Sequence, residues 1–297
     1  MHYILISFLR PFFFSLANII EGKLANTTFK KTTTMIFYIS LMNFAFLPLL
    51  LFLGRPTIPS FEVFCMLAFI GAVETTYLYP YYMAVKKIDV SIVTALFSLG
   101  QISIPIMSFF ILGEKLLPTQ YLGFFIIIIT SIILSIDNLK MPKLNKAFYY
   151  MTGVSLLLSF YMIVEKNILN IDDNWINVAF YPTLISGLIP SVFLLKKDCR
   201  KDIVKAFPLY KKNFKLMTLN ELICFGAIVA TAYGLSGLSP VVLASIAATV
   251  PIFTLVISYI LTKAFNVYCI ETLTKKIVSK KLACFCFIIA GVALAIG

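Results

Sequence analysis

The sequence predicts an all-α integral membrane protein, with about ten transmembrane helices arranged as two inverted five-helix repeats. Of its 297 residues, 60% are hydrophobic and only 13% are charged, whereas soluble domains average about 25% charged residues. Long apolar runs recur along the whole chain, and polar and proline positions of the first half recur in the second. Lipid permits only helices or closed barrels, and these continuous runs are too long for barrel strands.

The expected spans are apolar runs of the length that a membrane requires, about 20 residues each. They fall at 3–21, 35–53, 62–84, 89–112, 119–136, 148–168, 175–195, 214–234, 239–262 and 282–297. The short polar stretches between them form the connections.

Basic residues gather in alternate connections. The odd-numbered connections hold 21 of the 25 lysines and arginines, which places them in the cytoplasm and both termini outside. The formal net charge of +12 is spread over loops beside the spans, so we expect anionic lipid headgroups as partners and no nucleic acid. The densest basic loop contains Lys196, Lys197, Arg200, Lys201, Lys205, Lys211, Lys212 and Lys215.

An internal repeat divides the ten runs into two halves. The segment 15–25 aligns with 159–169, and 84–91 aligns with 232–239, each with polar identities. We therefore expect an N-terminal five-helix half at 1–136, a linker at 137–146 and a C-terminal half at 147–297. Since each half has an odd number of spans, the second enters the membrane from the opposite face, as in many secondary transporters.

Ten spans, two halves and a fourth span that ends in Leu112-Gly113-Glu114-Lys115 resemble the drug/metabolite transporter superfamily, EamA type. The second half departs from this pattern, because Tyr259-Ile260-Leu261-Thr262-Lys263 contains no Gly-Glu pair. The resemblance implies a permease with cytoplasmic termini, opposite to the lysine count, and we expect it in the bacterial inner membrane.

The third span carries the first candidate site residues. Glu74 lies near mid-span, and at 100° per residue Tyr77 and Tyr81 share its face while Tyr79 points away. An ionisable residue in a span usually faces a cavity or a partner. Pro80 removes a helical hydrogen bond near Thr76, which predicts a bend there.

The fourth and ninth spans carry polar stripes. In the fourth, Thr94, Ser98 and Gln101 recur at helical spacing, and Gln101 is too large to serve merely as small-residue packing. In the ninth, Thr249 is a secondary candidate within a stripe that equally fits packing between helices.

The first span and two later ones add ionisable groups. Arg10 needs water, a carboxylate or a substrate anion, and Glu74 is a partner of suitable depth. Glu21 and Glu165 occupy matching ends of the two halves, so structural roles at the membrane interface are favoured. Glu221 in the eighth span is ambiguous. These three glutamates are secondary candidates.

The leading functional hypothesis is a secondary transporter that moves a small organic metabolite or drug by alternating access, with Glu74 as a proton-coupling group. The alternatives are a channel or a non-transporting scaffold. No enzyme motif or nucleotide-binding loop occurs, so we expect no catalytic residues and no cofactor. With one histidine, and six cysteines interpreted as apolar fillers, we expect no metal site.

Overall fold

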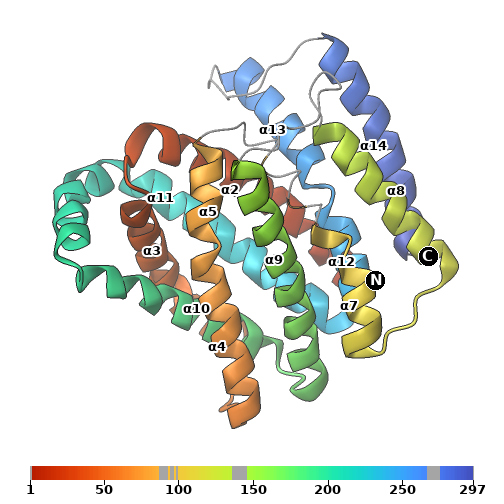
Figure 1. The fold of residues 1–297 in the computed structure, drawn as a ribbon, viewed down its shortest axis with the longest axis horizontal. Helices are drawn as coiled ribbons and strands as arrows, with labels where there is room; N and C mark the ends of the chain where they lie inside the picture. The colour runs from red at the N-terminus through yellow and green to blue at the C-terminus, as the bar shows by residue number, and fades with distance from the viewer. Residues whose placement is uncertain are drawn as a thin grey trace.

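The computed structural model describes residues 2–86, 93, 97, 100–135, 146–265 and 275–296. The described residues form a bundle of helices (Figure 1). In chain order the elements are α1 (His2–Ser7), α2 (Leu9–Lys23), η1 (Leu24–Thr28), α3 (Thr32–Leu53), α4 (Phe61–Thr76), α5 (Leu78–Val85), α7 (Ile104–Met107), η2 (Ser108–Leu112), α8 (Pro118–Ser135), α9 (Lys146–Ile171), α10 (Trp175–Leu188), η4 (Ile189–Leu194), α11 (Lys197–Gly237), α12 (Pro240–Ala247), α13 (Val250–Phe265) and α14 (Lys275–Ile296).

Seven helical segments of the described chain are long and apolar enough to cross a membrane. They are His2–Thr28, Thr32–Leu53, Phe61–Val85, Tyr149–Ile171, Trp175–Leu194, Lys197–Gly237 and Pro240–Leu261. Shorter apolar helices occupy Pro118–Thr130 and Cys286–Ala295. The chain is therefore a multi-pass membrane protein.

Seven of the ten expected spans thus correspond to helices of spanning length. The runs 119–136 and 282–297 fall on α8 and α14, whose apolar parts are shorter. Residues 89–92, 94–96, 98 and 99 of the run 89–112 lie outside the described residues, as does nearly all of the linker 137–146. The ten-helix count and the inverted repeat therefore remain predictions.

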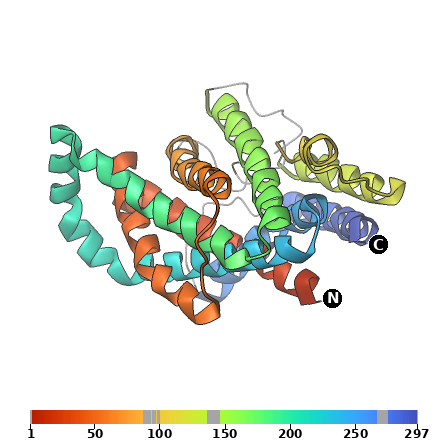
Figure 2. The same ribbon diagram turned by 90° about the horizontal axis from the view of Figure 1, so that it is seen from below.

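Helices from the two predicted halves pack against each other throughout the bundle. In the middle, α2 packs on α11 and α13, and α9 packs on α4 and α5. Beside them, α10 lies against α3 and α4, and α11 against α3. The view from below shows α9 crossing between α4 and α12 (Figure 2). The interior of the bundle is consequently built from both ends of the sequence.

The helices α8 and α14 form a close pair at one edge of the bundle (Figures 1 and 2). Small residues let them approach each other: a Cβ added at Gly123 would lie 2.5 Å from the Gly291 carbonyl oxygen and 2.7 Å from the Ala295 nitrogen. Membrane helices associate through such close packing because lipid supplies no hydrophobic force between them.

The Leu112-Gly113-Glu114-Lys115 motif has a local structural explanation. Gly113 ends η2 with a φ of 69°, a left-handed conformation that favours glycine. The next residue turns back, so that the Ser108 hydroxyl donates to a Glu114 carboxylate oxygen at 2.5 Å. The motif therefore closes the end of this helix.

The basic segment expected as a loop is instead the first half of α11, which curves around one end of α3 (Figure 1). Lysine, arginine, leucine and alanine favour helix, and Asp198 in the first turn complements the helix dipole. Tyr38 of α3 donates a 2.7 Å hydrogen bond to the Ile203 carbonyl. Lys31 pairs with Asp202, and this hydrogen bond raises the pKa of the lysine.

We expect Gly123→Leu to destabilise the protein by about 1–3 kcal/mol, since the new side chain would collide with the backbone of α14. Thermal melting in detergent measures the effect. Gly153→Leu is the control, because an added Cβ there meets nothing within 4 Å. Equal melting temperatures for the two variants would contradict the close packing of α8 and α14.

Candidate functional site

A cavity of about 250 Å³ lies within the bundle and is lined from both predicted halves. Its polar and ionisable lining residues are Arg10, Asn18, Glu21, Ser40, Asn43, Glu74, Tyr77, Tyr81, Gln101, Ser155, Ser159, Tyr161, Glu165, Ser186, Glu221, Cys224 and Thr231. Such a concentration of polar groups inside a chain that is 60% hydrophobic indicates a functional site.

Interrupted helices contribute to the cavity wall. Pro80 has no amide to bond the Thr76 carbonyl, and the third span breaks at Tyr77 between α4 and α5, close to the predicted bend. A second break separates α12 from α13, and Ala247 and Val250 beside it line the cavity. Broken helices in a membrane are tolerated where they line a cavity.

Glu74 and Glu165 face the cavity from opposite halves, on α4 and α9. The Tyr161 hydroxyl, one turn before Glu165, donates a 2.9 Å hydrogen bond to Glu74 Oε1. Glu74 Oε2 and Glu165 Oε2 are buried without a partner among the described residues. These two carboxyl groups therefore retain free acceptor atoms at the cavity.

Arg10 lies on the same side of the cavity, but the expected pair with Glu74 does not form. Within the described chain, its Nε and Nη1 atoms are buried without hydrogen-bond partners, and its guanidinium lies 5.3 Å from the Phe14 ring centroid. The carboxylate with which it has an attractive Coulomb interaction is Glu165. The expected depth of each residue in the membrane could not show which of two acidic residues on different helices lies nearer to Arg10.

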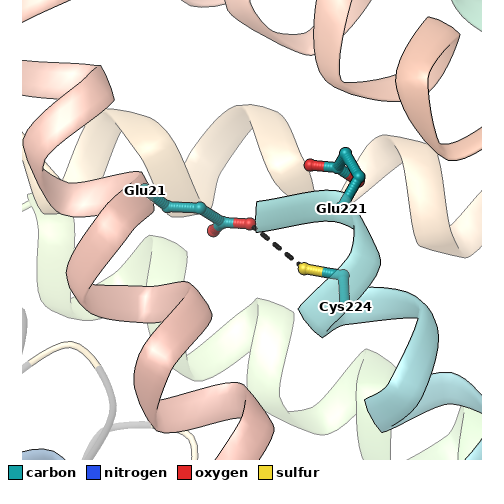
Figure 3. Close-up of side chains that lie close together, drawn as sticks. All are labelled: Glu21, Glu221 and Cys224. Atoms are coloured by element: carbon teal, nitrogen blue, oxygen red, sulfur yellow. Dashed lines mark hydrogen bonds between the residues drawn. The ribbon is translucent and has the colours of Figure 1, made fainter. Parts of the chain in front are cut away.

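A second acidic cluster joins α2 to α11 (Figure 3). Asn220 Nδ2 donates to Glu221 Oε1 at 2.7 Å and reaches Glu21 Oε1 at 3.4 Å. The Cys224 thiol points to the same Glu21 oxygen at 3.9 Å. Glu21, Glu165 and Glu221 are only 8%, 3% and 2% exposed, so all three face the interior of the bundle, and the interfacial depth expected for the first two stays a prediction.

The tyrosine face of the third span is arranged as the helical periodicity predicted. Tyr77 and Tyr81 line the cavity, whereas Tyr79 is 49% exposed on the outside. The Tyr81 hydroxyl donates to Asn18 Oδ1 at 2.9 Å, and its ring lies 6.3 Å from that of Tyr77. The two rings form one aromatic wall of the cavity.

The polar stripes of the fourth and ninth spans have different outcomes. Gln101 lines the cavity, with its Oε1 buried and unpartnered among the described residues. Thr94 and Ser98 lie outside the described residues. Thr249 does not line the cavity: at the break between α12 and α13 its hydroxyl donates to the Ile246 carbonyl at 2.7 Å.

Sequence reasoning missed several polar residues of this cavity, and two of them contact the candidate glutamates. Tyr161 lies four residues before Glu165, and Cys224 lies three residues after Glu221, so each shares a helix face with a candidate glutamate. That spacing was the available signal. Interpreting the cysteines as apolar fillers concealed the position of Cys224.

Comparison with known proteins supports the sequence-based family resemblance. Residues 2–136 match the model of the EamA-like transporter family. No curated protein matches the chain. A solved structure described only as "Crystal structure of protein" superposes with a TM-score of 0.64, covering 97% of this chain and 96% of that one at 13% identity. This likeness shows a shared fold.

We expect Arg10→Met to change the free energy of unfolding by no more than about 1 kcal/mol, because it removes a buried charge without a hydrogen-bonded partner. Denaturation in detergent measures the change, with Arg55→Met at an exposed position as control. A loss of about 3–5 kcal/mol would instead show that Arg10 belongs to a buried ion pair.

Proposed function

We propose that this chain, whose residues 2–136 match the model of the EamA-like transporter family, is a secondary active transporter for small organic cations. The match to a transporter family and the membrane helices support transport in general. The observation that supports a cationic substrate is the cavity itself, where four glutamates but only one arginine line the wall.

Charge balance favours a positively charged solute. Removing an ionised carboxylate from water is costly unless it is paired or protonated. With all four carboxyl groups ionised and Arg10 charged, the cavity would carry three negative charges in excess. An ammonium group in the cavity reduces this excess, while an anion would increase it.

Shape and surface favour a small solute with an apolar part. Ligand pockets of proteins span about 300–1,000 Å³, and a cavity of about 250 Å³ lies just below that range. The rings of Tyr77 and Tyr81 offer π faces that attract a cation or stack on an aromatic group. Glu74 Oε2, which lacks a partner among the described residues, supplies a free acceptor beside them.

Alternating access between two halves is the mechanism we propose. The halves are 1–136 and 147–297, joined by the linker 137–146, and the family match ends at residue 136. Contacts support an inverted repeat: the packing of α2 on α11 is mirrored by that of α9 on α4, and α8 pairs with α14. The cavity lies where the halves meet, as in inverted-repeat transporters.

A proton is the simplest coupling ion for such a cavity. Loading a cation beside Glu74 releases a proton from a carboxyl group, and unloading takes one up again, which links transport to pH. A channel would instead require rings of like charge or of carbonyl groups along a pore. A scaffold would have no use for unpartnered polar atoms around a void.

Anionic lipid is the proposed partner of the basic half of α11. Most of its lysines are exposed, and Val204, Phe207 and Phe214 beside them are exposed apolar side chains. A helix with both features binds at a membrane surface. We place the protein in a bacterial inner membrane, where anionic lipids supply that surface.

The first test is thermal-shift screening of the purified protein against amines, guanidines and quaternary ammonium compounds, with carboxylates and sugars as neutral or anionic comparisons. A ligand at about 100 times its Kd stabilises the folded protein by about 2.7 kcal/mol. We expect cations to raise the melting temperature of the wild type and to lose this effect in Glu74→Gln. Glu62→Gln is the control, because Glu62 is exposed at the start of α4.

In proteoliposomes we expect Glu74→Gln to abolish uptake of the cation so identified, while the variant stays folded in detergent. Undiminished transport by this variant would remove Glu74 from the mechanism. Stabilisation by anions rather than cations would contradict the proposed substrate class, and ohmic single-channel current would favour a channel.

A further inference from the structure

The four buried glutamates form two pairs, and each pair joins the two halves. Glu74 on α4 lies with Glu165 on α9, and the two interact electrostatically. Glu21 on α2 lies with Glu221 on α11, with their carboxylate oxygens and the Cys224 sulfur within 4.8 Å of one another. Both pairs line the same cavity.

The two pairs correspond under the internal repeat. Glu165 follows Glu21 by 144 positions, and Glu221 follows Glu74 by 147 positions. The polar identities that define the repeat have similar offsets, for example Ser15 with Ser159 at 144. The first and third spans of one half therefore supply the residues that the sixth and eighth spans supply in the other.

The two glutamate pairs have different neighbouring side chains, although their positions correspond in the internal repeat. The pair Glu74 and Glu165 has the Tyr161 hydroxyl and the Arg10 guanidinium beside it. Around Glu21 and Glu221, no cationic side chain of the described residues contributes; their neighbours are the Asn220 amide and the Cys224 thiol. One pair has a cation within electrostatic range but no ion pair with it, and the other has no such cation among the described residues.

An unsatisfied atom points to a ligand at the second pair. Asn220 is 0% exposed and donates to both glutamates through Nδ2, but its Oδ1 is buried and unpartnered in the described chain. The Tyr82 hydroxyl, also 0% exposed, is oriented toward Glu21. A buried polar atom left in this way calls for an explanation such as an ion site.

We propose that Glu21 and Glu221, with the Cys224 thiol, form a second cation site of the cavity that binds the coupling proton, while Glu74 and Glu165 bind the substrate. This inference rests on the proposed transport function. Two carboxylates this close in a buried site repel each other and cannot both ionise without a cation. No cationic side chain of the described residues interacts with the pair, so a proton shared by the two carboxyl groups removes one of their two negative charges and relieves the repulsion.

The site is placed to connect protonation with movement of the halves. Among the described residues, the titratable groups that interact with the pair are Tyr77, Tyr81 and Tyr82 from the α4–α5 segment and Cys224 from α11. Asn220 and Asn18 complete the polar surroundings. Loss of the shared proton sets Glu21 of one half against Glu221 of the other, and this repulsion drives α2 and α11 apart.

Cd²⁺ offers a direct probe, since a thiolate and carboxylates together bind this soft divalent ion. Titrating the purified protein with Cd²⁺ at pH 7 forms a cadmium–thiolate bond, seen by ultraviolet absorption, and releases the thiol proton. If the carboxyl pair holds a proton as well, ion binding must release that too. We expect more than one proton per bound ion in the wild type, measured with a pH indicator in weak buffer.

Variants identify the source of each proton. Cys224→Ser removes the cadmium–thiolate absorption of this site. The absorption that remains in this variant comes from the other thiols and is subtracted from that of the wild type. Cys65→Ser and Glu62→Gln are the control variants. We expect the double variant Glu21→Gln, Glu221→Gln to release only the thiol proton and to bind Cd²⁺ more than about tenfold more weakly. Each single glutamine variant should show part of this loss of affinity.

Three results would overturn the proposal: release of only the thiol proton by the wild type, unchanged Cd²⁺ affinity in the double variant, or no Cd²⁺-thiolate absorption attributable to Cys224. None of these measurements requires transport. If no organic cation stabilises the protein in the thermal-shift screen, the substrate assignment is contradicted and the proton site is not. If the Cd²⁺ titration fails while organic cations stabilise the protein, the proton site is contradicted and the substrate assignment is not.

Discussion

Burial of ionisable groups is the constraint around which the middle of this protein is built. A carboxyl group inside a membrane must be protonated, hydrogen bonded, paired or in contact with water. Four glutamates meet this requirement by facing one cavity, where Tyr161, Asn220 and Cys224 provide the nearby donors. The breaks at Tyr77 and between α12 and α13 are tolerated because they border the same cavity.

Besides the contacts of the glutamates, hydrogen bonds join helices of the two predicted halves around the cavity. Beside the glutamates, the Ser15 hydroxyl reaches the Val250 carbonyl at 2.9 Å, and Ser155 Oγ accepts from the Gly100 amide at 2.6 Å. Such hydrogen bonds between membrane helices average only about 0.6 kcal/mol. The cavity wall can therefore rearrange at small cost, which suits a protein whose proposed halves move against each other.

Helical periodicity was a good guide wherever a residue and its neighbours lie on one helix. It placed Tyr77 and Tyr81 on the face of Glu74, and it would have found Tyr161 and Cys224 from the glutamates near them. It failed where two helices had to be compared. Arg10 interacts with Glu165 rather than Glu74, and only the packing of the helices shows that Glu21 and Glu165 line the same cavity.

The sequence by itself determined the membrane class, the positions of most helices, the bend caused by Pro80 and the EamA-like character of residues 2–136. These properties follow from local hydrophobicity, backbone chemistry and short motifs. Only the tertiary structure decided which glutamates meet, that the basic segment at 197–215 is helical, and that Thr249 is not part of the cavity lining. Those outcomes depend on how helices that are distant in the sequence pack against each other. The pattern of residues in a single sequence does not contain the distances between such helices.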